Sequence, residues 1–157
     1  MSFQRGVIAI LILVLTSCGI DVPELVVTLR PPMGLKVWFT TNDTIKLEFW
    51  GFNDEDYFSG YVVFASSSYS EIADTTKSLG EKPKIPNMET RALPTFSVLP
   101  TSEPTNYVFE LPLTVQSESG NIVFIKGFQY YIAVAGYSAS KKIYSPLSNI
   151  TNVVLTN

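Results

Sequence analysis

A strict alternation of side chains near the C-terminus constrains the fold more than any other feature of the sequence. Along residues 130–136 the side chains divide into two sets, with Tyr130, Ile132 and Val134 on one face and Tyr131, Ala133 and Ala135 on the other. A period of two residues is that of a β-strand. A polar break at residues 138–142 separates this run from a second extended run at residues 143–154. The pattern therefore predicts two paired antiparallel strands.

Similar alternation earlier in the chain predicts further strands. It is clearest at residues 45–50, where Ile45, Leu47 and Phe49 alternate with Lys46, Glu48 and Trp50. One apolar and one polar face is the pattern of an antiparallel sheet with one side in water. Shorter runs at residues 25–30, 35–39, 60–65 and 107–111 have the same character. Short strands at this spacing predict an all-β fold, a sandwich of about seven antiparallel strands.

The C-terminal pair of predicted strands also carries a motif. Gly127-x-x-Tyr130-x-Ile132-x-Val134, followed by Ser145-Pro146-Leu147-Ser148-Asn149, resembles the last two strands of a fibronectin type III domain. The resemblance implies an immunoglobulin-like sandwich over residues 23–157, in which the Tyr130 hydroxyl contacts an upstream backbone group. Where that family has an inward tryptophan, this sequence has Phe49. Either Phe49 fills the core position, or a β-bulge turns Trp50 inward.

Residues 66–105 interrupt the strand pattern. They contain five prolines and a run of serines, a composition typical of a long connection with little regular structure. Because loops beyond about 15 residues are uncommon in compact domains, this insertion is where the chain should differ most from a plain fibronectin type III domain.

The N-terminus has the composition of a targeting segment. Arg5 precedes an apolar run at residues 6–15 that is shorter than the roughly 20 residues a membrane-spanning helix needs. Leu15-Thr16-Ser17-Cys18 resembles a bacterial lipobox. The resemblance implies a signal peptide at residues 1–17, a diacylglyceryl group on the Cys18 sulfur, and a lipidated tether at residues 18–22. An ordinary secretory signal with an incidental cysteine is the alternative.

The expected location follows from this motif. Cys18 is the sole cysteine of the chain, so an exported protein would have no internal disulfide. The resemblance implies a lipid-anchored protein of the bacterial cell envelope. Gly19 stands where an aspartate would resemble an inner-membrane retention signal, which favours the outer membrane.

Composition argues against catalysis and against several classes of partner. The chain has no histidine, which removes Ser-His-Asp and Cys-His arrangements and the commonest zinc ligand. We therefore expect no enzyme activity and no cofactor.

The acidic run at residues 53–56 lacks the spacing of a calcium loop, so we expect a solvated loop and no metal. A net charge of −3 without a basic cluster argues against nucleic acid.

One predicted sheet face needs a cover. If Tyr61, Val63 and Ala65 face the core, the outward set formed with the neighbouring strand is wholly apolar or aromatic: Val62, Phe64, Tyr131, Ala133 and Ala135. Monomers rarely leave such a patch open. Either the insertion folds back and buries it with Phe96, Val98 and Leu99, or the patch binds a partner through Tyr131 and Phe64.

These expectations describe a lipid-anchored, non-catalytic binding or adhesion module. Its partners would be the membrane, through the N-terminal lipid, and a protein or glycan of the envelope or of a host. A structural subunit of an envelope complex and an accessory domain to an envelope enzyme are the alternatives.

Overall fold

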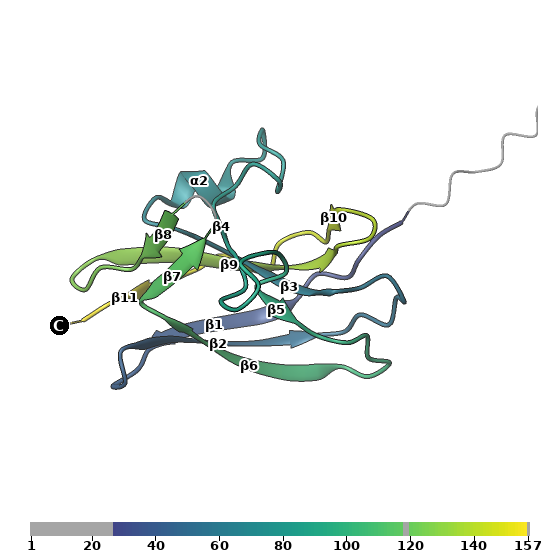
Figure 1. Cartoon of the computed structure of the whole chain (residues 1–157), viewed down its shortest axis with the longest axis horizontal. Helices are drawn as coiled ribbons and strands as arrows, with labels where there is room; N and C mark the ends of the chain where they lie inside the picture. The colour runs from purple at the N-terminus through teal and green to yellow at the C-terminus, as the bar shows by residue number, and fades with distance from the viewer. Residues whose placement is uncertain (1–26, 118–119, 157) are drawn as a thin grey trace, which may run out of the picture.

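Two antiparallel β-sheets packed face to face make up the domain (Figure 1). The computed structural model describes residues 27–117 and 120–156. The first sheet has the order β1-β2-β6, with β1 Met33–Phe39, β2 Thr44–Gly51 and β6 Thr105–Pro112. The second sheet centres on β9 (Gln129–Ser138), which pairs with β3 (Gly60–Ser66), β10 (Ile143–Tyr144) and β11 (Thr151–Val154). The all-β sandwich predicted from the sequence is confirmed.

Short elements complete the described part of the chain. The insertion at residues 66–105 contains helix α2 (Tyr69–Ala73) and two-residue strands β4 (Lys84–Ile85) and β5 (Phe96–Ser97), both paired with β3. A separate hairpin joins β7 (Thr114–Ser117) to β8 (Gly120–Val123). No helix in the described ranges has both the length and the apolar character to cross a membrane. Residues 1–17 and Cys18 lie outside these ranges.

The core between the sheets is built from the predicted alternations. Phe49 from β2 meets Tyr61 from β3 edge to face, with ring centroids 4.9 Å apart. Both side chains are fully buried, whereas Trp50 is 48% exposed. Phe49 therefore fills the core position and Trp50 points to solvent, as the first of the two alternatives predicts.

Strand β9 is buried on both faces. Ile132 and Val134 lie in the core between the sheets, while Ala133 and Ala135 belong to a second apolar cluster on the other side. The Tyr130 hydroxyl accepts a hydrogen bond from the Ile125 backbone N–H at 2.9 Å, so the expected upstream contact is present.

The predicted edge strand at residues 25–30 is wrong for its described part. Residues 27–32 are not in a strand, and the first strand starts at Met33, after Pro31 and Pro32. Leu29 is nevertheless buried in the core. The Arg30 carbonyl accepts from the Asn53 side chain at 3.3 Å, so a side chain rather than a neighbouring strand satisfies this backbone group.

The predicted C-terminal strand is present but interrupted at residues 145–150. Pro146 cannot donate to a ladder, and the segment leaves the regular pattern there. Two serine hydroxyls serve as acceptors instead: Ser145 Oγ accepts from Gly136 N at 2.8 Å, and Ser148 Oγ accepts from Val134 N at 3.0 Å. These two buried N–H groups of β9 are thereby satisfied.

Candidate functional site

The predicted partner face of β3 and β9 lies beneath other parts of the chain. Val62, Phe64, Ala133 and Ala135 are fully buried, and Tyr131 is half-buried. Ile72 of α2 belongs to the same cluster, and partly buried residues from outside β3 and β9 pack against it: Leu79, Leu93, Tyr144, Leu147 and Ile150. The chain's own insertion and C-terminal segment therefore keep this face from solvent, and Phe64 offers no surface to a partner.

The residues that form this cover differ from those we expected. Phe96 and Val98 pack against the core between the sheets, where Phe96 stacks on Phe109 at 4.0 Å. Leu99 is 84% exposed. The reason is register: Phe96 pairs directly with Tyr61, and paired residues of antiparallel strands point to the same side of the sheet. Since Tyr61 points into the core, Phe96 does too.

A buried lysine, Lys82, forms hydrogen bonds to the C-terminal end of helix α2. Lys82 is 5% exposed, and its ammonium donates to the Ile72 carbonyl at 2.8 Å and to the Asp74 carbonyl. A cation near the last carbonyls of a helix satisfies acceptors that have no partner within the helix. On the outside, a shallow groove of about 440 Å³ separates α2 from residues 146–150.

The other sheet carries two exposed tryptophans on its outer face. We call it the tryptophan face; it is the outer face of β1, β2 and β6 and comprises Met33, Lys36, Trp38, Thr44, Lys46, Glu48, Trp50, Asn106, Val108 and Glu110. Trp38 is 37% exposed and Trp50 is 48% exposed. They are the two tryptophans of the whole chain. Since tryptophan is highly buried on average, both indoles at one surface mark it as a candidate binding site.

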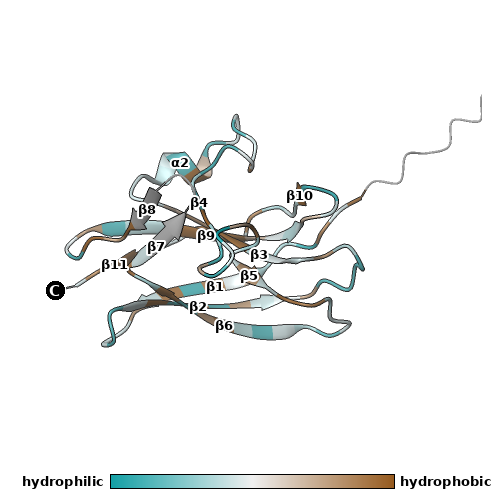
Figure 2. Ribbon diagram, viewed as in Figure 1, coloured by the Kyte–Doolittle hydropathy of each residue, from teal (hydrophilic) through white to brown (hydrophobic). Residues whose placement is uncertain are grey.

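Charged side chains separate the two indoles. Lys36 pairs with Glu48 at 3.7 Å, and Lys46 pairs with Glu110 at 3.9 Å. The Lys46 ammonium also lies 5.9 Å from the centre of the Trp38 ring. With two lysines and two glutamates, the face has no net charge. Figure 2 shows the corresponding hydrophilic teal segments along these strands.

The strand alternation contained the signal for this site. Lys46, Glu48 and Trp50 were predicted to point outward, and Trp38 alternates with the inward Val37 and Phe39. What sequence reasoning missed was the pairing of Trp38 with Lys46, which places the two indoles on one sheet face.

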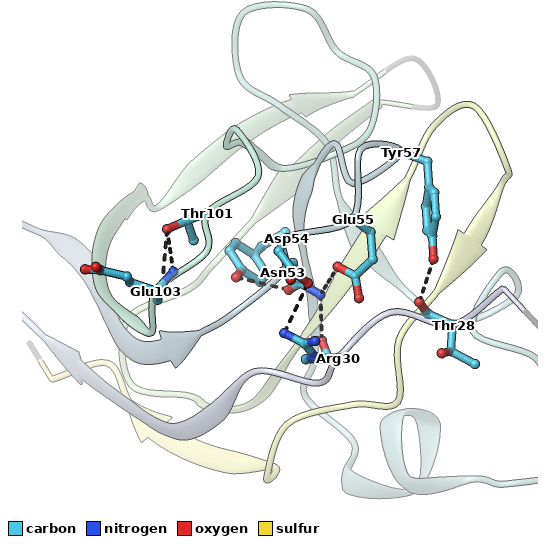
Figure 3. Close-up of polar contacts among 9 residues, drawn as sticks. Thr28, Arg30, Asn53, Asp54, Glu55, Tyr57, Thr101 and Glu103 are labelled. Carbon is cyan, nitrogen blue, oxygen red and sulfur yellow. Dashed lines mark hydrogen bonds and ion pairs between the residues drawn. The ribbon is translucent and has the colours of Figure 1, made fainter.

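The acidic run at residues 53–56 forms a structural loop around a buried asparagine (Figure 3). Asn53 donates to the Arg30 carbonyl and to Glu55, each at 3.3 Å, and accepts from the Tyr61 hydroxyl at 3.3 Å. Asp54 pairs with the Arg30 guanidinium at 3.2 Å. Burial, the largest cause, raises the pKa of the Tyr61 hydroxyl. Among the described residues, no group of three or more His, Cys, Asp or Glu side chains is placed to hold a metal ion.

A Ser-x-x-Lys spacing occurs at the end of β9. Ser138 and Lys141 are three residues apart, the spacing of some serine nucleophiles. The Ser138 hydroxyl is buried and accepts from the Lys141 backbone N–H at 3.2 Å. This contact is that of a turn residue, with the lysine side chain exposed.

Comparisons with known proteins name no family for this chain. No family model matches the sequence, and no curated protein does. The chain is similar to a structure of chicken CNTN1 FN1–FN3 domains, at 12% identity over 82% of this chain and 33% of that one, with a TM-score of 0.48. It is similar to an α-L-rhamnosidase from Dictyoglumus thermophilum, at 19% identity over 83% of this chain and 13% of that one, with a TM-score of 0.45.

A third similar structure is a Fn3-like protein from Clostridium thermocellum. Its identity is 19% over 78% of this chain and 88% of that one, with a TM-score of 0.37. The chain spans a third or less of the length of the first two structures. The fold class rests on the two sheets described above.

Proposed function

We propose that this chain is a lipid-anchored, non-catalytic binding or adhesion module of a bacterial cell envelope, and that it holds its partner on the tryptophan face. The observation that carries the proposal is the exposure of Trp38 and Trp50 on one sheet surface. Interfaces favour tryptophan anchors, and the other large aromatic surface of the sandwich is covered by the chain itself.

The anchor part of the proposal is supported by the residues around Cys18. A thioether needs a thiol, and Cys18 follows Leu15-Thr16-Ser17 at the spacing of the lipobox pattern. Several acyl chains hold a protein stably where one would not. Few residues separate Cys18 from the described domain, so the sandwich would sit close to the membrane, with the outer membrane favoured over the inner.

The non-catalytic part is supported by chemistry. The chain has no histidine, the side chain whose ordinary pKa suits proton transfer near neutral pH. Each of its four described ion pairs joins one cation to one carboxylate, and the side chains of all four pairs are partly exposed to solvent. This arrangement favours a binding surface over a reaction centre.

Binding to native envelope material tests the site. Wild-type protein should bind to envelope fractions of the cells that produce it, and Trp50→Ala should reduce that binding at unchanged stability, because Trp50 is exposed and contributes little to the fold. Phe128→Ala is the matched control, since Phe128 is a 56% exposed aromatic residue away from this face. Equal binding by wild type and Trp50→Ala would remove the tryptophan face from the proposal.

A further inference from the structure

We propose that the tryptophan face binds a neutral glycan chain. This inference rests on the proposed function and names the chemical class of its partner. Two features of the face select that class: charged groups occupy its centre, and those charges cancel.

The position of the charges argues against a protein partner. The cores of protein–protein interfaces are depleted in charged residues. Here Lys46 and Glu48 lie on the central strand between the two indoles, and Lys36 and Glu110 lie on the flanking strands. A protein docked across this face would remove four charges from water, which is costly without new partners. Sugar hydroxyls can donate to the carboxylates and accept from the ammonium groups, so a glycan would keep all four hydrogen-bonded.

The balance of the charges argues against an ionic polymer. Each lysine of the face is paired with a glutamate, at 3.7 Å and 3.9 Å. Neither a polyanion nor a polycation would find an unmatched field to attract it. The ligand class that fits is uncharged and rich in hydroxyl groups.

The indoles supply the remaining contact. The flat face of a sugar ring presents C–H groups, which pack on the negative face of an aromatic ring. Trp38 pairs with Lys46, and Trp50 lies four residues beyond Lys46 on β2, so the backbone positions of the two tryptophans are about 14 Å apart along the strands. A chain of several sugar rings can bridge that distance, with its hydroxyls over the charged side chains between the indoles. Asn106, paired with Trp50 on β6, adds a polar side chain at one end.

Tryptophan fluorescence tests the inference directly, because both tryptophans of the chain are on this face. We would titrate the full-length protein in detergent with three neutral polymers, hydroxyethyl cellulose, galactomannan and dextran, and with polygalacturonate as an acidic control. At least one neutral polymer should give a saturable blue shift of the emission maximum, with none from polygalacturonate. Trp38→Ala and Trp50→Ala leave one reporter each, and each should weaken the binding about tenfold.

The outcomes separate the inference from the function on which it rests. Absence of a shift with all three neutral polymers, a stronger response to polygalacturonate, or unchanged affinity in both alanine variants would overturn glycan binding. If Trp50→Ala loses envelope binding while no neutral polymer binds, the proposed function stands and the partner is not a neutral glycan. Phe128→Ala should respond as wild type does, since its tryptophans are intact.

Discussion

Tyr61 connects the core to the loop at residues 53–56 through the hydrogen bond between its hydroxyl and Asn53. Ionisation of this hydroxyl makes the free energy of unfolding depend on pH in the alkaline range. The pKa of this hydroxyl is raised above its ordinary value of 10.0, chiefly by burial. A raised pKa means that the folded protein keeps the proton where the unfolded chain loses it. The contribution is therefore fully present below pH 10 and is lost as the pH rises above it.

We predict that the Tyr61→Phe variant loses less stability than wild type when the pH is raised. The free energy of unfolding of wild type should fall between pH 8 and pH 11, by up to about 1.4 kcal/mol per pH unit for one group. The variant should be less stable at pH 8, because it lacks the hydrogen bond to Asn53, but should lose less between the two pH values. Tyr144, whose pKa burial also raises, accounts for part of the loss that remains. Urea denaturation at both pH values measures the difference, and equal slopes would contradict the assignment.

At the scale of elements, helix α2 acts as part of the cover on β3 and β9. Its Ile72 is fully buried against Val62, Phe64 and the alanines of β9. Ile72→Ala should destabilise the domain by about 2–5 kcal/mol, because the cover cannot fully close over the lost volume. Leu99→Ala, in the same insertion but exposed, should change stability by less than about 0.5 kcal/mol. Guanidinium denaturation measures both, and equal midpoints would show that α2 is not a structural cover.

The strands could be predicted from the sequence wherever one face of the sheet is exposed to solvent. Ile45, Leu47 and Phe49 alternate with polar neighbours, so their strand and its facing follow from the pattern. The end of the insertion could not be placed in this way, because the side that Phe96 faces depends on its pairing with Tyr61, far away in the sequence. The predicted strand is absent at residues 27–30 for the same reason: local alternation does not reveal that Asn53 donates to the Arg30 carbonyl.

The candidate site followed from the sequence only in part. The need for a cover on β3 and β9 could be inferred from their apolar outward residues. The side chains that form this cover could not be inferred from the sequence. Leu147 and Ile150 reach that face because the chain leaves the regular strand pattern at Pro146. The tryptophan face required the register of β1 against β2, which is set by the turn between them.

At the scale of the whole molecule, the lipid proposed on Cys18 would hold the sandwich at a membrane. In a Triton X-114 separation, wild-type protein should enter the detergent phase, because the acyl chains proposed on Cys18 would partition into micelles. Cys18→Ser cannot form the thioether and should remain in the aqueous phase. The described domain is present in both, so identical partitioning of the two proteins would contradict lipidation at Cys18.

The pairing of β3 with β9 also determines when the domain can be completed. Six of the seven residues of β3 are buried, yet its main partner strand lies in the last third of the sequence, since Val63 pairs with Val134. A chain that emerges from its N-terminus first can form the β1–β2 hairpin early, but β3 must wait for β9. Closing so long a loop before its contacts form is slow. During that interval the edge of β3 that pairs with β9 is open, which exposes this hydrophobic strand to aggregation while the chain folds.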